Sequence, residues 1–271
     1  MCLAAIASGL NPRFPWVLAS NRDEFFDRAA APLAWWQAAA GEESLLGGRD
    51  LSAGGAWLAV RRNGHLALVT NVREPGRHLS DAPSRGELVP LWLRSAAVRA
   101  QPERLLQPAR NGFNLLATDL ASDHAGLWLS NRAPSPQPLR PGVHGLSNAA
   151  LNTPWPKLTL LIQQLQAVVA PADSAAQLTE AAFAALADRS LAPDHSLPQT
   201  GLPLDRERAL SALFIRITAP GSERALYGTR CSTVVVLEHQ GSKRVVHMTE
   251  RSVDDLGRVS GEVHESFELT A

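Results

Sequence analysis

The sequence predicts an α+β fold in which antiparallel sheets pack against helices. Short apolar runs separated by turn residues fill the first half and the last part of the chain, a pattern typical of strands joined by hairpins. Between them, residues 155–214 carry the apolar periodicity of helices. Because strands both precede and follow the helices, we expect a single domain over residues 1–271.

The first predicted hairpin brings polar residues close to the chain terminus. Two apolar runs, 1–8 and 15–20, flank a turn-like stretch. If the strands pair directly from that turn, Cys2 lies opposite Asn21. A slip of one residue would turn different side chains toward Cys2, because side chains alternate between the two faces of a strand.

The second predicted hairpin spans residues 56–71. It turns at Asn63-Gly64, the strongest short hairpin signal. With these two residues as the loop, Arg62 pairs with His65.

Capping and periodicity place the remaining elements. The spacing in Ser84-Arg85-Gly86-Glu87 is that of a capping box and predicts a helix over 88–98. Further helices are predicted at 155–169, 174–186 and 206–214. Further strands are predicted at 113–118, 126–130, 143–148, 229–238, 244–250 and 261–269.

Composition argues against several classes of partner. Lys plus Arg and Asp plus Glu both number 26, so charge gives no basis for binding nucleic acid or an anionic membrane. Two cysteines are too few for a disulfide framework and fit a reducing compartment. Without a signal-peptide pattern or a long apolar run, we expect a cytoplasmic protein with no stable membrane insertion. No metal-ligand spacing or cofactor motif is found, so we expect no metal and no cofactor.

Cys2 is the strongest candidate for chemistry. Methionine aminopeptidase removes an initiator methionine when the second residue is small, and the product carries a thiol and a free α-amine on one residue. An α-amine with a pKa of about 8 is a plausible base at neutral pH, so nucleophile and base would be tethered. The alternative is an ordinary small apolar residue at the start of a buried strand.

The cluster Asn21-Arg22-Asp23-Glu24 needs polar partners at its strand end. In the predicted hairpin those partners include the thiol and amine of Cys2, so a carboxylate could hold the amine while Arg22 favours the thiolate. The alternative is a solvated turn with an internal Arg–Asp pair.

Side-chain amides at strand ends are candidates for stabilising an oxyanion. Asn71 ends the second hairpin, and Asn148 ends the stretch "GVHGLSNA". The alternative is that asparagine simply favours turns after strands. Arg230, at the start of a strand, is either a site residue or a rim arginine. Arg49 and Asp50 either pair with each other or line a pocket mouth.

Stretches along nearly the whole chain resemble the NRDE family, whose eukaryotic members are called transport and Golgi organization protein 2. They are "MC" at the start, "NRDEFFDR" at 21–28, "GGRDLSAGGAWLAV" at 47–60, "LVTNVRE" at 68–74, "SRGELV" at 84–89, "GFNLLATD" at 112–119, "GLSNAALNTPWPK" at 145–157 and "YGTRCSTVV" at 227–235. One departure is Arg28-Ala29, where an Arg-Pro pair is usual.

That family in turn resembles the N-terminal-nucleophile hydrolases of the choloylglycine hydrolase and penicillin V acylase branch. The resemblance implies a four-layer αββα sandwich and hydrolysis of linear amides by an N-terminal cysteine. The catalytic residues it implies are Cys2 as nucleophile and base, Arg22 and Asp23 around it, Asn71 and Asn148 at the oxyanion, and Arg230 in support. The residues expected to contact substrate are Asn21, Glu24, Arg49 and Asp50. In that branch the arginine and aspartate stand three positions apart, so the contiguous pair here leaves open whether Asp23 or Glu24 orients the nucleophile.

Three functions are consistent with these features. The first is an amide hydrolase or acyltransferase acting on a small acylated substrate. The second is a non-catalytic binding or trafficking protein for haem or an acyl-CoA or other lipid, because eukaryotic relatives are associated with Golgi organisation and with haem and lipid handling. Its pocket walls would be tryptophans, whose rings otherwise serve the core: Trp35, Trp36, Trp57, Trp92 and Trp155. The third is a catalytically inactive scaffold that keeps the fold.

Overall fold

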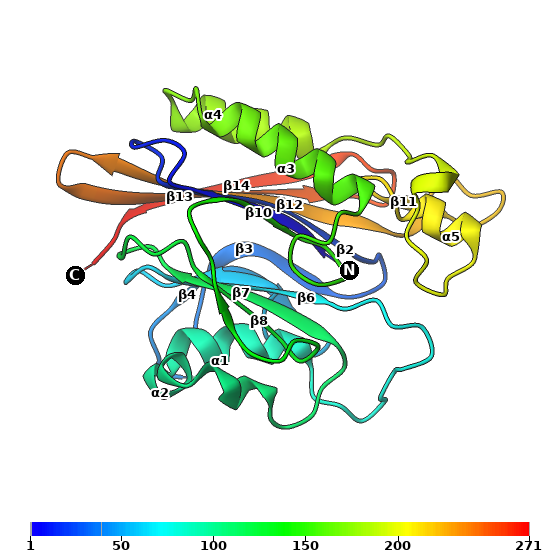
Figure 1. Cartoon of the computed structure of the whole chain (residues 1–271), viewed down its shortest axis with the longest axis horizontal. Helices are drawn as coiled ribbons and strands as arrows, with labels where there is room; N and C mark the ends of the chain where they lie inside the picture. The colour runs from blue at the N-terminus through cyan, green and yellow to red at the C-terminus, as the bar shows by residue number, and fades with distance from the viewer. Residues whose placement is uncertain (1, 39, 271) are drawn as a thin grey trace.

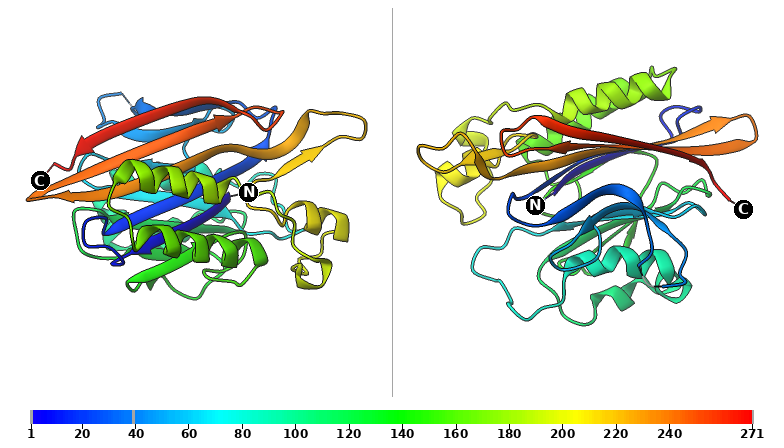
Figure 2. Two further views of the ribbon diagram at one scale, coloured as in Figure 1. Left: turned by 90° about the horizontal axis from the view of Figure 1, so that it is seen from above. Right: turned by 180° about the vertical axis from the view of Figure 1, so that it is seen from behind.

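Two antiparallel sheets lie face to face between two layers of helices in the computed structural model, which describes residues 2–38 and 40–270 (Figure 1). Helices α3 and α4 cover the outer face of the upper sheet, and α1 and α2 cover the outer face of the lower one (Figures 1 and 2). This four-layer αββα order is the predicted fold class, which is therefore confirmed.

The upper sheet contains β1, which begins at Cys2, and the longest strands. Its strand order is β10-β1-β2-β12-β13-β14, with β11 paired to β12, and every pair is antiparallel. The strands are β1 (Cys2–Ser8), β2 (Trp16–Phe25), β10 (Gly142–Leu146), β11 (Arg216–Thr218), β12 (Ala225–Gln240), β13 (Lys243–Val253) and β14 (Val259–Glu268). The short β11 was not predicted.

The lower sheet runs in chain order from β3 to β9. Its strands are β3 (Ala30–Trp36), β4 (Leu45–Asp50), β5 (Leu58–Val60), β6 (His65–Asn71), β7 (Phe113–Asp119), β8 (Leu127–Ser130) and β9 (Gln137–Pro138). Strands β3, β4 and β9 were not predicted from the sequence, and the first two contain residues that usually break strands. Pro32 lies within β3, and Gly47 lies within β4 where a Cβ atom would come 2.4 Å from the carbonyl oxygen of Leu58.

The predicted helices form with shifted ends. They are α1 (Leu88–Arg94), α2 (Ala96–Ala100), α3 (Pro156–Val169), α4 (Ala175–Leu186) and α5 (Leu204–Ala209), with single turns at Arg85–Glu87, Pro102–Leu106 and Asp194–Ser196. The helix expected over 88–98 breaks at Ser95, which has an extended backbone and accepts a hydrogen bond from the Val98 amide to cap α2. Within the described ranges, no helix is both long and apolar enough to cross a membrane.

The first hairpin forms one residue out of the expected register. Cys2 pairs with Arg22 rather than Asn21, and Ser8 pairs with Trp16. The reason is the loop, in which the amide of Gly9 donates to the carbonyl of Pro15 at 2.9 Å, so that Pro15 lies opposite Gly9 rather than Ser8.

The second hairpin also differs by one residue. The amide of Arg61 donates to the carbonyl of His65 at 2.9 Å, so the loop has three residues instead of two. Gly64 closes it with a positive φ of 96°, a conformation in which glycine carries little strain.

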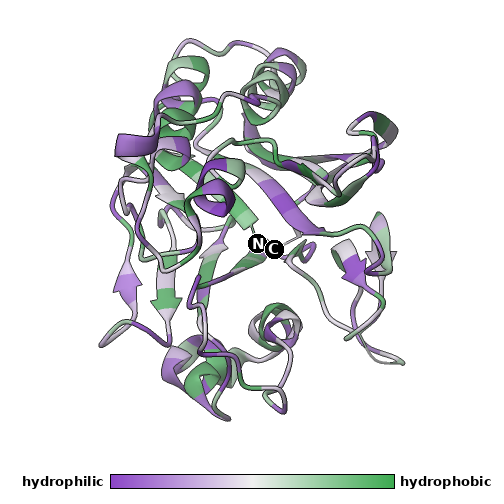
Figure 3. Ribbon diagram, turned by 90° about the vertical axis from the view of Figure 1, so that its right-hand side faces the viewer, coloured by the Kyte–Doolittle hydropathy of each residue, from purple (hydrophilic) through white to green (hydrophobic). Residues whose placement is uncertain are grey.

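Alternation along β1 separates two cores. Ala4 and Ile6 face the lower sheet and join the core between the sheets, whereas Leu3 and Ala5 face α3 and α4. Bands of hydrophobic and hydrophilic residues alternate along the strands and helices in Figure 3, as expected for elements with one buried side. Cys2 continues the face of Ala4 and Ile6, so its side chain is directed between the sheets.

Candidate functional site

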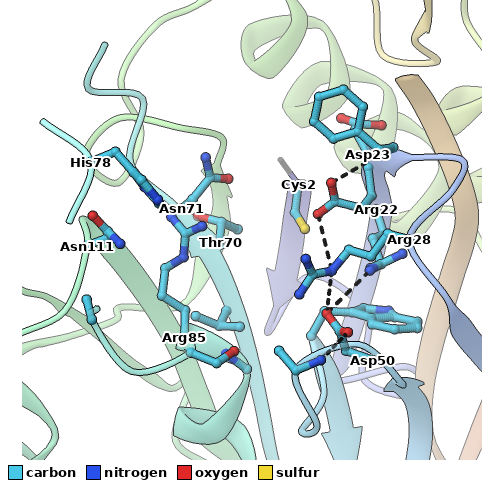
Figure 4. A pocket seen from close by; sticks show the side chains of 18 of the residues that line it. Cys2, Arg22, Asp23, Arg28, Asp50, Thr70, Asn71, His78, Arg85 and Asn111 are labelled. Atoms are coloured by element: carbon cyan, nitrogen blue, oxygen red, sulfur yellow. Dashed lines mark hydrogen bonds and ion pairs between the residues drawn. The ribbon is translucent and has the colours of Figure 1, made fainter. Parts of the chain in front are cut away.

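A cavity of about 920 Å³ opens where β1 begins. Its walls come from β2, the end of β6, the loop and turn at 78–87, and the segment around α5. The predicted site residues that line it are Cys2, Arg22, Asp23, Glu24, Asp50 and Asn71. Figure 4 shows the Cys2 sulfur between a wall carrying Asn71 and Arg85 and a wall carrying Arg22 and Asp23.

Arg22 is the cross-strand neighbour of Cys2. Its guanidinium carbon lies 4.2 Å from the centre of the Trp57 ring, and its Nη2 lies 3.8 Å from Oδ2 of Asp50. No residue among those described accepts a hydrogen bond from its buried Nη1. Burial raises the pKa of the Cys2 thiol, and Arg22 is among the charges that oppose this shift.

Asp23 is held at the end of β2 by two residues of β12. Thr229 Oγ1 donates to Oδ1 of Asp23 at 2.8 Å, and the Tyr227 hydroxyl donates to its carbonyl at 3.1 Å. A bulge at Arg230 lets Thr229 pair with Asp23 and Cys231 pair with Arg22. Burial raises the pKa of the Asp23 carboxyl, and the positive charge of Lys157 opposes that shift.

Lys157 is a charged residue of this region that the sequence analysis missed. It lies in the first turn of α3 and is only 3 % exposed. Its Nζ has no hydrogen-bond partner in the described part of the chain. Burial lowers its pKa to about 8, with the negative charge of Asp23 acting in the opposite direction. The available signal was its rarity, because it is one of two lysines in a chain with 26 basic residues.

Asp50 connects Arg22 to the turn after β2. Its Oδ2 accepts from Nε of Arg28 at 2.8 Å, and Arg28 lies 4.0 Å from Glu24. Its Oδ1 accepts from the backbone amides that follow β4. Asp50 therefore pairs with Arg28 and not with Arg49, whose guanidinium lies over the Trp36 ring away from the cavity.

Asn71 and Asn148 form a pair in which only Asn71 lines the cavity. Nδ2 of Asn148 donates to the carbonyl oxygen and to Oδ1 of Asn71, at 3.1 and 3.0 Å. No acceptor for Nδ2 of Asn71 is found among residues 2–38 and 40–270. Asn71 is thus the free amide donor, and Asn148 lies behind it as a support rather than as a second donor to the cavity.

Arg230 and Asn21 lie outside the cavity lining. Nη1 of Arg230 donates to the carbonyls of Phe25 and Arg28, so it fixes the turn that carries Arg28. Asn21 alternates with Arg22 and therefore leaves the opposite face of β2. There its Nδ2 donates to the carbonyls of Leu186 and Leu213 at 2.9 Å, which anchors the sheet to the last residue of α4 and to the segment after α5.

The remaining walls combine Arg85 and the exposed Arg206 with apolar residues. Arg85, which the sequence analysis assigned only to a helix start, reaches the cavity beside Asn71 (Figure 4). The apolar residues near α5 that line the cavity are Leu202, Leu210 and Ile217. In the ranges 2–38 and 40–270, no group of three or more His, Cys, Asp or Glu side chains is placed to hold a metal ion.

A model of the family described as Transport and Golgi organisation 2 matches residues 1–255. The chain belongs to this family. A Transport and Golgi organization 2 homolog from Mus musculus is 31% identical over 248 residues, which cover 88% of this chain and 87% of the relative. The Homo sapiens homolog is 32% identical over 256 residues, covering 88% and 87%, and the Drosophila melanogaster protein is 29% identical over 280 residues, covering 95% of each.

Two solved structures are also similar to this Transport and Golgi organisation 2 family member. The ortholog of N-acylethanolamine-hydrolyzing acid amidase from Caenorhabditis elegans matches with a TM-score of 0.48 and 11% identity, over 87% of this chain and 92% of its own. A mutant of the conjugated bile acid hydrolase from Clostridium perfringens matches with a TM-score of 0.41 and 8% identity, over 98% and 96%. Since both scores are below 0.5, the four-layer assignment rests on the sheets and helices described above.

Proposed function

We propose that this member of the Transport and Golgi organisation 2 family is an amide hydrolase or acyltransferase that uses Cys2 as its nucleophile after removal of Met1. The observation that carries the proposal is the position of Cys2, whose thiol lines a cavity together with Arg22, Asp23 and Asn71. These groups supply the nucleophile, two charges to orient it and an amide donor. The substrate would be a small acylated molecule.

The proposed reaction begins when removal of Met1 frees the α-amine of Cys2. The amine accepts the thiol proton, and Sγ attacks the acyl carbon of the substrate to form a tetrahedral adduct. Nδ2 of Asn71 donates a hydrogen bond to the oxygen that becomes negative. The carbon–nitrogen bond then breaks, and the amine gives its proton to the leaving nitrogen.

The acyl group is then carried by Cys2 as a thioester. In hydrolysis, water attacks the acyl carbon, the carbon–sulfur bond breaks, and the acid leaves as the thiol is restored. In acyl transfer, a second amine takes the place of water.

Local charges support this division of roles. Burial raises the pKa of the Cys2 thiol, so little thiolate forms at neutral pH without a nearby base. Arg22, across the strand pair, favours the thiolate once it forms, and the Asp23 carboxylate would hold the protonated amine. Asp23 takes this part in the proposal rather than Glu24, because its Oδ1 is already oriented by Thr229.

Mass spectrometry of the purified protein tests the proposal at its first step. We expect Met1 to be absent and iodoacetamide to label Cys2, which lines the cavity, but not Cys231, which packs in the core between the sheets and whose thiol pKa burial raises well above its ordinary value. A Cys231→Ser variant should label like the natural chain, and a Cys2→Ser variant should not label. Quantitative retention of Met1 would refute the mechanism, because no free amine would exist at Cys2.

A second candidate is a carrier for haem or for an acyl-CoA or other lipid. It is favoured by the volume of the cavity and by its apolar residues Leu202, Leu210 and Ile217. If the protein is a carrier, Cys2→Ser binds the ligand as well as the natural chain and no acyl donor is turned over. For haem, an absorbance titration tests binding. An unchanged Soret band at micromolar haem would exclude haem as the ligand.

A further inference from the structure

Arg85 occupies the wall of the cavity that faces Cys2 (Figure 4). It lies in the single turn Arg85–Glu87, which hydrogen bonds fix to Ser84 and to Ala56. Oγ of Ser84 accepts from the amide of Gly86 at 3.2 Å, and the carbonyl of Gly86 accepts from the amide of Ala56 at 3.1 Å. The turn therefore presents the Arg85 side chain to the cavity from an anchored backbone.

The arginines of the opposite wall already have carboxylate partners. Arg22 and Arg28 both lie within ion-pair distance of Asp50, and Arg28 also approaches Glu24. These pairs neutralise much of the charge on that wall. A negatively charged ligand would have to compete with Asp50 and Glu24 to bind there.

Arg85 has no carboxylate partner within 4.0 Å in the described ranges. Among residues 2–38 and 40–270, its side chain makes one hydrogen bond, from Nη1 to the carbonyl of Gly112 at 3.3 Å. Burial lowers the pKa of its guanidinium, which nonetheless stays charged at physiological pH. A partly buried guanidinium with unused donors is the group that most often binds carboxylates and phosphates in proteins.

The same cavity offers an apolar surface for the rest of a ligand. Leu210 and Ile217 pack with Tyr227 in a small cluster beside α5, and with Leu202 they line the cavity. Among the described residues that line the cavity, Arg85 is thus the partly buried arginine without a carboxylate partner, since Arg206 is exposed, and it shares the lining with aliphatic side chains. A ligand that satisfies both has an anionic group and an apolar chain.

We propose that Arg85 is the binding residue for the carboxylate or phosphate of an amphipathic acyl ligand, whose chain contacts Leu202, Leu210 and Ile217. The inference gives the charge class of the substrate and rests on the proposed function for the identity of the site. It concerns binding alone, and the Cys2 thiol is not needed for it.

Calorimetric titration of the full-length Cys2→Ala protein tests this inference without turnover. The probes are N-lauroylglycine and lauryl phosphate as anions and N-lauroylethanolamine as the neutral ligand. We expect at least one anion to bind more tightly than the neutral ligand. Adding Arg85→Gln should weaken that anion by about tenfold to a hundredfold and leave the neutral ligand unchanged, and Arg85→Lys should restore part of the loss. The anion that loses more affinity identifies the preferred group.

Arg206→Gln is the matched control, because Arg206 lines the same cavity but is exposed. This variant should keep the preference for the anion. Thermal unfolding of each variant verifies that it is folded at the titration temperature. Equal binding of anionic and neutral probes by Cys2→Ala, or an equal loss of both in Arg85→Gln, would overturn the inference. The two proposals can fail separately. If Cys2→Ala prefers the anion but the natural protein hydrolyses or transfers no acyl group, the proposed function is refuted and this inference stands.

Discussion

Cys2 and Arg22 are paired across the first two strands of the upper sheet, and both side chains leave the face that looks toward the lower sheet. The pairing places a guanidinium beside the thiol, and the Trp57 ring on the lower sheet stacks against that guanidinium. A register one residue different would have placed Asn21 beside Cys2. The contact between thiol and cation therefore depends on the loop that sets the register.

Removing the Arg22 charge should make Cys2 less reactive. Arg22 lowers the pKa of a thiol that burial has raised, so Arg22→Gln should raise that pKa further. We expect alkylation of Cys2 by iodoacetamide at neutral pH to slow by about tenfold, with its pH profile moved upward. Arg22→Lys should retain most of the rate. An unchanged profile in Arg22→Gln would show that Arg22 does not act on the thiol.

The two asparagines should be separable by kinetics and stability. Asn71→Ala removes the donor that faces the cavity, so kcat for an acylated substrate should fall by about a hundredfold to a thousandfold while stability changes little. Asn148→Ala should lower kcat as well and also reduce the free energy of unfolding by about 1–3 kcal/mol, because it removes both hydrogen bonds that the buried Asn148 side chain donates to Asn71. Denaturant unfolding and steady-state kinetics on both variants measure the difference. Loss of activity in Asn148→Ala alone would argue against Asn71 as the donor and Asn148 as its support.

Asn21 should matter for stability and not for chemistry. Its side chain donates to the carbonyls of Leu186 and Leu213 and accepts from the Ser232 hydroxyl at 2.6 Å, all on the face away from Cys2. Asn21→Leu should lower the free energy of unfolding by about 1–3 kcal/mol, because buried polar groups lose their partners. The kcat of the folded protein should be unchanged at a temperature well below unfolding. A fall in kcat with an unchanged free energy of unfolding would show that Asn21 takes part in the reaction.

Lys157 should make stability depend on pH in the alkaline range. Burial lowers its pKa from an ordinary value of 10.5 to about 8, so between these pH values the unfolded chain binds more protons at this residue than the folded protein. The contribution of Lys157 to the free energy of unfolding therefore rises with pH across this window, by up to roughly 3 kcal/mol, and is lost as pH falls toward 8.

Chemical denaturation at a series of pH values from 7 to 11 (about the span that contains both pKa values) checks this expectation. Compared with the natural chain, Lys157→Met should lose the rise across the window. Lys243→Met is the control, since Lys243 is exposed and paired with Glu268 at 2.8 Å. Parallel curves for Lys157→Met and the natural chain would contradict the expectation.

Local patterns predicted most of the fold. Apolar runs and turns located both early hairpins, and capping and periodicity located the helices. The registers were missed because they depend on how each loop closes, through Gly9 and Pro15 in one case and Gly64 in the other. Strand β3 was missed because it contains Pro32, which usually breaks strands. Strand β4 was missed because it contains Gly47, and the reason for a glycine there is the close approach of the neighbouring strand, which local propensity does not show.

The candidate site could be predicted where its residues follow from strand pairing. Cys2, Arg22 and Asp23 are brought together by one hairpin, so their proximity was visible in the sequence. The role of Asn148 could not be predicted, because its side-chain amide donates to Asn71, a partner 77 residues away in the sequence. Lys157 and Arg85 were missed because each is a single charged residue at the start of a helical segment, and only the packing of that segment brings Lys157 near Asp23 and Arg85 to the cavity.

Detection of an acyl group on Cys2 tests the central claim most directly. The purified protein would be incubated with a thioester acyl donor, quenched in acid, and its N-terminal peptide analysed by mass spectrometry, with Cys2→Ala as the control. We expect a peptide that begins at Cys2 and carries the acyl group on sulfur, sensitive to hydroxylamine and absent from the control. A peptide that still begins with Met1, or an acyl group found equally in Cys2→Ala, would contradict the account.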